Sequence, residues 1–287
     1  MSSILETDGL RPTRVMALPT VFLSHGSPMH AIDAGIAGRA WAELGLRLPR
    51  PRAVLIASAH WETSVPMLTG SPRPETIHDF GGFPDELYRL RYPAPGAPEV
   101  ASEIVARLKA ADITAGIDGC RGLDHGAWVP LRWMYPKADV PVVQLSIQPD
   151  HDTEHHLRLG RALQPLADEG ILIIGSGHAT HNLRDWASSP RRQEPLPYAD
   201  AFSRWLQQSL VSADADALTH YRDRAPDAAR AHPTEEHFLP LFIAWGAAGA
   251  GATAERIVEG FEAGALALDS YLFHPAASLL HRMTHSA

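Results

Sequence analysis

The sequence has one cysteine, no strongly basic segment and no long uninterrupted apolar run. The lone Cys120 excludes an intrachain disulfide and a thiolate metal site, and a reducing, cytoplasmic setting is the simplest expectation. Asp and Glu outnumber Lys and Arg by 33 to 25, a net charge of -8, which argues against nucleic acid or an anionic membrane as a partner. The charge-free stretch 238–254 contains Pro240 and several glycines, so we expect a buried helix and a loose turn rather than a membrane span.

Several common catalytic signatures are also missing. The chain has no H-E-x-x-H zinc-protease motif, no G-x-S-x-G nucleophile elbow and no phosphate loop of the G-x-x-x-x-G-K-S/T type. Gly175 and Gly177 follow an apolar run, but Thr180 stands where the dinucleotide fingerprint requires glycine. The sequence therefore argues against a helix-borne zinc-protease site and against a Rossmann dinucleotide site.

We expect one catalytic domain over residues 17–287, preceded by a flexible N-terminal segment at 1–16. The start of the chain carries Glu6 and Asp8 and lacks the apolar core that a secretory signal peptide needs. No internal repeat and no clear domain boundary follow, and 287 residues suffice for one large α/β domain with a substantial core.

Short apolar runs alternate with helical patterns along the chain, which is typical of α/β proteins. We expect strands near 17–24, 52–60, 140–147 and 170–174, an edge hairpin within 256–273, and helices near 36–48, 98–111, 129–134, 153–169, 198–212, 215–222 and 235–245. The predicted fold class is α/β, a single domain with a central, mostly parallel (mixed) sheet flanked by helices.

Histidine is the residue type that the sequence has in excess, with 16 copies. Two of the apolar strands end in a histidine, at His25 and His60, and the separation of about 35 residues fits one βαβ crossover. Ligands of open α/β sheets bind beyond the carboxyl ends of the strands, so both imidazoles are expected in one crevice there. Three further stretches carry histidines, namely His125, His178 with His181, and His237.

A set of imidazoles spread over five strand ends or loops favours a metal centre at the C-terminal ends of the strands. Three imidazoles that face an open position suit zinc, iron, copper or nickel. Other histidines stand in polar or terminal surroundings and are expected at the surface: His30, His151, His155, His156, His220, His274, His281 and His285.

Seven short stretches, in their order along the chain, resemble the aromatic ring-opening dioxygenases of the DOPA extradiol dioxygenase type. They are His25-Gly-Ser-Pro-Met29, Ser58-Ala-His-Trp61, Ile77-His-Asp-Phe-Gly-Gly-Phe-Pro84, Asp124-His-Gly126, Val142-Val-Gln-Leu-Ser146, Ser176-Gly177 with His181-Asn-Leu183, and Pro233-Thr-Glu-Glu-His-Phe-Leu-Pro-Leu241. The larger class includes the protocatechuate 4,5-dioxygenase catalytic subunit, and the similarity runs from about residue 17 to residue 273. It implies a single α/β domain around a mostly parallel sheet, with a non-haem iron(II) in the crevice.

The resemblance also implies roles for individual residues. His25, His60 and His237 match the metal ligands of the family. His181 matches the histidine that acts as acid and base beside the metal, and whether it is also a ligand stays open. His125 matches a second active-site histidine near the substrate and oxygen.

The third metal ligand departs from the protocatechuate branch, in which that position is a glutamate. Here the match falls on His237, with Glu235 and Glu236 just before it. Three neutral ligands leave the site more positive, which favours a dianionic catecholate and also accommodates zinc. His178 has no firm counterpart, and we expect it to contact the substrate or to support the site from behind.

The implied activity is insertion of O2 into a catechol, DOPA-like or otherwise small, to give a ring-opened semialdehyde. Three protein ligands on octahedral iron(II) leave positions for both catechol oxygens and dioxygen. An imidazole with a pKa near the operating pH can remove a proton and return it. The loop with Phe80 and Phe83 is a candidate substrate wall, and we expect a preference for small or zwitterionic catechols over polycyclic ones.

Histidine ligands alone do not choose the metal. Fe(II) is expected for activity, and Zn(II) is a second possible occupant, so a zinc-dependent hydrolase that uses the same crevice is the alternative function. A metal-storing or structural protein is a further alternative, and it is disfavoured because closed structural sites are not built on an open crevice. The partners expected are a small-molecule catechol and O2, with neither nucleic acid nor a membrane.

Overall fold

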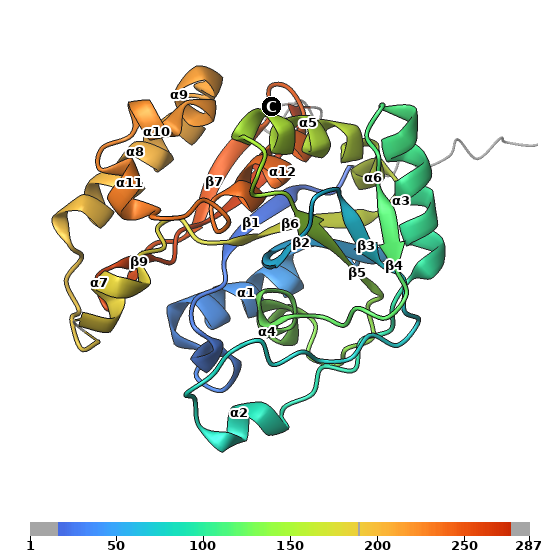
Figure 1. The fold of residues 1–287 in the computed structure, drawn as a ribbon, viewed down its shortest axis with the longest axis horizontal. Coiled ribbons are helices and arrows are strands. Elements are labelled where there is room, and N and C mark those ends of the chain that lie inside the picture. Colours follow the sequence, from blue (N-terminus) through green and yellow to red (C-terminus); the bar gives the residue numbers. More distant parts are fainter. Residues whose placement is uncertain (1–16, 189, 277–287) are drawn as a thin grey trace, which may run out of the picture.

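The computed structural model describes residues 17–188 and 190–276, and an eight-stranded mixed sheet runs through this part of the chain (Figure 1). The predicted N-terminal segment 1–16, His281 and His285 lie outside the described residues. The strand order is β4-β3-β5-β2-β6-β1-β10-β7. The strands are β1 Thr20–Ser24, β2 Ala53–Glu62, β3 Met67–Thr69, β4 Gly116–Asp118, β5 Val142–Ile147, β6 Ile171–Gly177, β7 Thr253–Val258 and β10 Ser270–His274.

The four central strands, β5, β2, β6 and β1, pair in parallel, as does β3 with β4. The pairs β3–β5, β1–β10 and β10–β7 are antiparallel. The prediction of a mostly parallel, mixed sheet is therefore confirmed. The expected hairpin near 256–273 is the antiparallel pair β7–β10, with a small second sheet of β8 Phe261–Glu262 and β9 Leu266–Ala267 between its strands.

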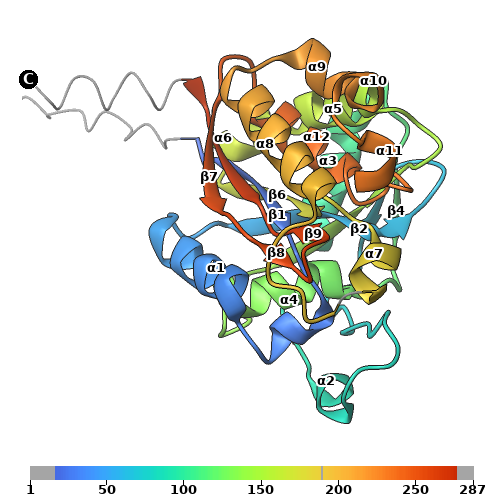
Figure 2. The same cartoon turned by 90° about the vertical axis from the view of Figure 1, so that its left-hand side faces the viewer.

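Helices cover both faces of the sheet, because the central strands are apolar on both sides (Figure 2). Val54 and Ile56 of β2 pack into one core with α1 Gly35–Arg47 and α4 His125–Met134. Leu55 faces the opposite core, which is shared by α3 Pro98–Ala110, α5 Thr153–Leu163 and α12 Leu239–Ala248. The other helical elements are η1 Pro28–Ala31, α2 Asp85–Arg89, α6 Pro165–Asp168, α7 Leu183–Ser188, α8 Pro197–Val211, α9 Ala215–Thr219, α10 Tyr221–Arg224 and α11 Ala228–Ala231.

The glycines of the incomplete dinucleotide motif have a packing role. A Cβ atom at Gly175 would lie 2.1 Å from the carbonyl oxygen of Pro240, and one at Gly177 would lie 2.1 Å from that of His237. Only glycine allows such close contact between β6 and the turn that enters α12. This contact holds His237 beside the ends of β6 and β1.

Several element boundaries differ from the sequence expectation. The helix expected over 215–222 is two short helices, α9 and α10, and the helix expected over 235–245 is α12, which begins at Leu239. The helix expected over 153–169 breaks between α5 and α6, because Pro165 has no N–H to continue the helical ladder. His125 is the first residue of α4 rather than part of the preceding loop, and the Asp124 side chain caps this helix by accepting from the Ala127 N–H.

Two histidines expected at the surface are buried. His30 packs under Glu262, with 3.5 Å between Nε2 and Oε2, and the Glu262 side chain also accepts a hydrogen bond from the Ser27 N–H. His156 is fully buried in α5. The stretch 238–254 forms the buried helix α12 and the turn after it, and within the described ranges no helix is both long and apolar enough to cross a membrane.

Burial of His156 should make the metal-free protein lose stability on mild acidification. Its Nδ1 donates to the Asp152 carbonyl and its Nε2 accepts from the Gln148 N–H, so both nitrogens are satisfied in the neutral form. Burial lowers the pKa of His156 from 6.5 to about 4. Between these values only the unfolded state takes up this proton, so the contribution of His156 to stability falls as pH drops from 6.5 towards 4, by at most about 3 kcal/mol.

Urea unfolding at pH 7 and pH 5 measures this loss. A His156→Gln variant should show a shallower pH dependence, whereas His220→Gln, at an exposed position, should retain the wild-type dependence. Equal pH dependence in all three proteins would contradict the assignment to His156.

Candidate functional site

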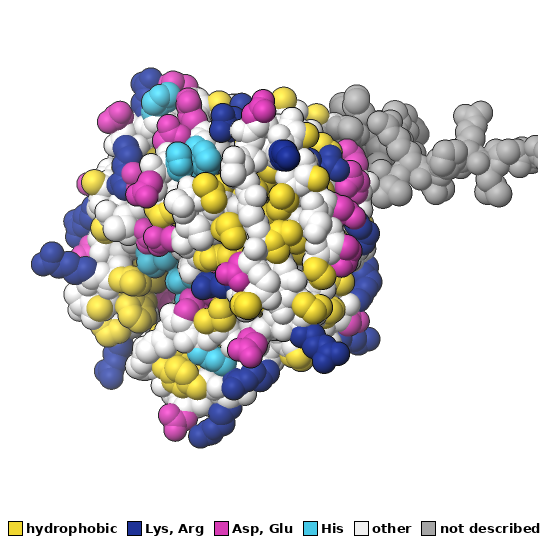
Figure 3. All heavy atoms as spheres, turned by 45° about the vertical axis from the view of Figure 1, so that its right-hand side comes forward, with side chains coloured by type: hydrophobic (Ala, Val, Ile, Leu, Met, Phe, Trp, Pro, Cys, Tyr) yellow, Lys and Arg dark blue, Asp and Glu magenta, His cyan; other side chains and the backbone are white. Residues whose placement is uncertain are grey.

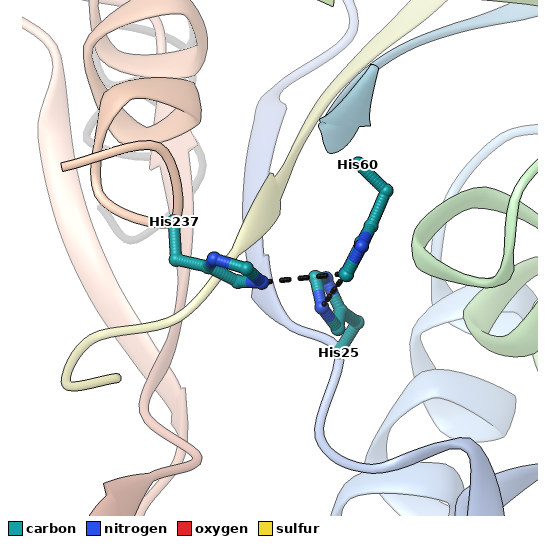
Figure 4. Close-up of side chains that lie close together, drawn as sticks. All are labelled: His25, His60 and His237. Atoms are coloured by element: carbon teal, nitrogen blue, oxygen red, sulfur yellow. Dashed lines mark hydrogen bonds between the residues drawn. The ribbon is translucent and has the colours of Figure 1, made fainter. Parts of the chain in front are cut away.

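Three histidines from separate elements converge beyond the C-terminal ends of β1 and β2 (Figure 4). His25 follows β1 directly, His60 lies near the end of β2, and His237 lies in the turn before α12. The Nε2 atoms of His25 and His60 are 3.1 Å apart, and those of His60 and His237 are 3.3 Å apart. Candidate ligand atoms of all three residues lie within 4.8 Å of one another.

Hydrogen bonds on the outer side of each ring set its tautomer. The Nδ1 of His25 lies 3.0 Å from the Ser176 hydroxyl, which itself donates to the Gly126 carbonyl and so must accept from the imidazole. The Nδ1 of His237 lies 2.8 Å from Glu236 Oε1. An acceptor on Nδ1 places the proton there and leaves the Nε2 lone pair free.

The Nδ1 of His60 forms no such hydrogen bond but lies 3.3 Å from Asp79 Oδ2, within ion-pair distance of the carboxylate, which favours a proton on Nδ1. Three Nε2 lone pairs therefore point to one centre, where neutral acceptors this close repel one another unless a cation or a proton lies between them. This donor set fits a divalent metal ion with three imidazole ligands.

The site holds its histidines in the neutral form that a metal ligand requires. Burial, followed by the charge of neighbouring imidazoles, lowers the pKa of His25 and His237 well below the usual value. The same two causes lower the pKa of His60 to about 3.

Asp79 joins His60 to His125. Its Oδ2 lies 2.9 Å from the Nδ1 of His125, and its Oδ1 accepts from the His125 N–H at 2.8 Å. Burial alone would raise the pKa of Asp79, but the hydrogen bonds and nearby imidazoles outweigh it and lower the pKa to about 2. The ionised carboxylate thus fixes the ring of His125 and leaves Nε2 as the free nitrogen of that ring.

His181 and His178 follow β6 and complete a set of six imidazoles. The ring of His181 stacks on that of His237, with 3.4 Å between centroids and an interplanar angle of 13°. His178 is 1% exposed, donates its backbone N–H to the His237 carbonyl, and has no hydrogen-bond partner for Nδ1. Burial and neighbouring imidazoles lower the pKa of both rings to about 3, below the near-neutral value expected for the acid–base residue.

These six imidazoles line a cavity of about 250 Å³. The other part of its wall is largely apolar, and the side chains that form it are Pro28, Phe80, Phe83, Leu183, Trp186 and Leu266. A cavity of this size holds one small organic molecule beside the three converging Nε2 atoms.

Comparison with known proteins identifies the family. Residues 19–266 match the family described as the catalytic LigB subunit of aromatic ring-opening dioxygenase. The chain belongs to this family. The resemblance seen in the sequence is confirmed, and the chain is an extradiol aromatic ring-opening dioxygenase.

Individual LigB-family relatives cover almost the same length. The chain is 44% identical over 259 residues to a 4,5-DOPA dioxygenase extradiol of Beta vulgaris, covering 88% of this chain and 96% of the relative. It is 40% identical over 256 residues to a protein of the same name from Escherichia coli K12, covering 88% and 93%. A crystal structure of an uncharacterized Escherichia coli K12 protein superposes with a TM-score of 0.76 at 35% identity, covering 89% of this chain and 99% of that one.

The structure of this LigB-family chain brings together all six histidines singled out in the sequence. Sequence reasoning gave no role to Asp79 or Ser176, although both lie in the stretches that carry the resemblance. The sequence also did not show which of the two adjacent glutamates, Glu235 or Glu236, contacts the histidines. Glu235 points away and pairs with Arg222 at 3.2 Å, whereas Glu236 hydrogen-bonds His237. Asp79 and Glu236 place two carboxylates behind the three neutral imidazoles and offset the positive character expected for the site.

The two adjacent glutamates allow a matched test of the carboxylates that lie behind the histidines. Glu236→Gln should weaken metal binding roughly tenfold to a hundredfold, because a neutral amide orients and polarises His237 less well than a carboxylate. Glu235→Gln removes the same charge one residue away and should leave the affinity unchanged. Competition with a chromophoric chelator measures both, and wild-type affinity in Glu236→Gln would rule out a role for this carboxylate in metal binding.

Proposed function

We propose that this protein is a metal-dependent catechol dioxygenase that opens the ring beside, rather than between, the two hydroxyls of a small catechol. The convergence of three Nε2 lone pairs in one small cavity is the observation that carries the proposal. His25, His60 and His237 are the ligands, Fe(II) is the active metal, and Zn(II) is able to occupy the same site. Family membership independently supports a small-molecule substrate and O2.

A divalent metal held there supplies Lewis acidity towards the catechol hydroxyls and, as iron(II), the capacity to react with dioxygen. The protein supplies the position of the ring. Holding substrate and oxygen against one centre makes their reaction effectively intramolecular. The buried floor, formed in part by His25, His178 and His237, keeps bulk water from the reacting edge of the ring.

His181 and His125 are the residues proposed to move protons. His181 is neutral at neutral pH, as a residue that accepts a proton must be, and its low pKa makes it a weaker base than an ordinary imidazole. His125, oriented by Asp79, presents Nε2 to the cavity near the substrate and oxygen. His178 lies in the cavity wall and is the residue proposed to contact the substrate.

The charge of the surface supports a small-molecule partner. On the face shown in Figure 3, Lys and Arg side chains are interspersed with Asp and Glu and form no basic patch. Nucleic-acid binding depends on clustered positive charge, and the net charge of -8 opposes it. We therefore propose neither nucleic acid nor a membrane as a partner.

Loading the apoprotein anaerobically with iron(II) or with zinc tests the function. Addition of a catechol and oxygen should give oxygen uptake and visible semialdehyde absorbance with iron, and neither with zinc. The three-histidine donor set also suits a zinc hydrolase. Such an enzyme would hydrolyse members of an ester or amide panel when it is loaded with zinc, and it would consume no oxygen. Activity with zinc alone would overturn the proposal in favour of that alternative.

A further inference from the structure

The irregular segment that follows β6, residues 178–181, is fixed at each of its four positions. Hydrogen bonds to three distant parts of the chain hold its backbone: His178 N–H donates to the His237 carbonyl at 2.8 Å, Ala179 N–H to Ser24 Oγ at 3.0 Å, and His181 N–H to the Ala231 carbonyl at 2.8 Å. The segment carries two of the six cavity histidines, so these contacts determine where both imidazoles lie.

Thr180 supplies the fourth anchor through its side chain. This residue is fully buried, and its hydroxyl donates to the Ala265 carbonyl at 2.8 Å and accepts from the Ala267 N–H at 2.7 Å. The two backbone groups lie two residues apart at β9, and one hydroxyl satisfies both as a neighbouring strand would. Thr180 therefore ties the segment 178–181 to the hairpin formed by β8 and β9.

The same hairpin contacts the opposite side of the cavity. In β8, the Glu262 carboxylate accepts a hydrogen bond at 3.1 Å from the N–H of Ser27, which lies two residues after His25. In β9, Leu266 forms part of the cavity wall. The hairpin thus bridges the loop that follows His25 and the segment that carries His181, and Thr180 is its link to that segment.

Building on the proposed function, in which His181 moves protons, we infer that Thr180 is a positioning residue that aims the His181 imidazole at the bound catechol. Thr180 precedes His181 in the chain and is not one of the residues that line the cavity, so it acts through that histidine rather than on the substrate. Proton transfer requires hydrogen-bond distance, and a displacement of about 1 Å costs on the order of a hundredfold in rate. Without the hydroxyl, no side-chain bond at residue 180 opposes such a displacement.

Two substitutions at this position test the inference on the iron-loaded enzyme. Thr180→Val keeps the shape of the side chain and removes both hydrogen bonds, whereas Thr180→Ser keeps the hydroxyl. We expect Thr180→Val to lose on the order of tenfold or more in kcat, while KM for a small catechol and iron content stay near their wild-type values. Thr180→Ser should restore most of the lost kcat.

Thr20 offers a matched control for the loss of a buried hydroxyl. Its side chain is buried in β1 and donates to the Ala244 carbonyl at 2.6 Å, and the residue is not part of the cavity wall. Thr20→Val should therefore keep the wild-type kcat even where it lowers the thermal midpoint.

Combination with His181→Ala shows whether Thr180 acts through His181. In that case Thr180→Val lowers kcat in the wild-type background but changes the residual kcat of His181→Ala by less than about twofold. A purely structural role of Thr180 would instead lower kcat by the same factor in both backgrounds.

The outcomes separate this inference from the proposed function. Wild-type kcat in Thr180→Val, loss of its iron, or an equal loss of kcat in both backgrounds would overturn the inference alone. If circular dichroism shows Thr180→Val to be unfolded, Thr180→Ala removes the same hydroxyl with a smaller side chain, and the same loss of kcat and the same dependence on His181 are expected of it. Failure of the wild-type iron-loaded protein to cleave any catechol would contradict the proposed function itself.

Discussion

Replacement of His25, His60 or His237 with alanine is expected to abolish stoichiometric metal binding and ring-cleaving activity. Each variant leaves two imidazoles where three converge, and loss of one of three ligands removes most of the affinity. Metal should raise the thermal midpoint of the wild-type protein, because only the folded state has the assembled site, and should not raise that of the variants. Metal analysis after gel filtration and a thermal scan with and without iron(II) measure both effects.

The control for these variants is Cys120→Ser. Cys120 is exposed, so its replacement should change neither metal content nor turnover. A large loss in that variant would show that a thiolate takes part after all. Conversely, a histidine variant that keeps one equivalent of iron and near-normal turnover would remove that residue from the ligand set.

His181→Ala should retain iron and lose on the order of a hundredfold or more in kcat, the usual contribution of a positioned acid–base residue. The ring of His181 stacks on His237, and His181 forms a second candidate group with Glu236 and His237 that is separate from the group of His25, His60 and His237. We therefore expect its removal to leave the three-histidine group intact. His181→Gln should lose a similar factor, since an amide forms hydrogen bonds but does not exchange a proton near neutral pH.

The pH dependence gives an independent readout for His181. The neutral imidazole is the base, and its pKa of about 3 places the loss of the base form well below neutral pH. We therefore expect no ascending limb from His181 between pH 6 and 8 in the wild-type profile. Loss of iron in His181→Ala would make it a ligand, and near-wild-type kcat would transfer the proton-transfer role to His125.

The sheet and its histidine-bearing ends could be predicted because their signals are local. The apolar runs that form β1 and β2, such as residues 53–57, predict strands that are buried on both sides. His25 follows the first of these strands, and His60 lies near the end of the second. The break at Pro165 and the burial of His156 also had local signals. Proline ends a helical pattern, and His156 shares one helix face with Leu159 and Leu163, three and seven residues on.

The remaining features depend on contacts between distant segments. Asp79 reaches His125 across 46 residues, and Ser176 reaches His25 across 151. The burial of His30 depends on Glu262, far along the chain. No periodicity in the sequence encodes such pairs, so the hydrogen-bond partners behind the histidines became visible only with the fold.

A single-turnover reaction tests the central claim most directly. Protein loaded with one equivalent of iron(II) is mixed anaerobically with one equivalent of a small catechol and then exposed to oxygen. The account predicts one O2 consumed for each catechol lost, with semialdehyde absorbance appearing at the same rate. Oxygen consumption that yields quinone and hydrogen peroxide with the ring intact, or no consumption at all, would contradict it.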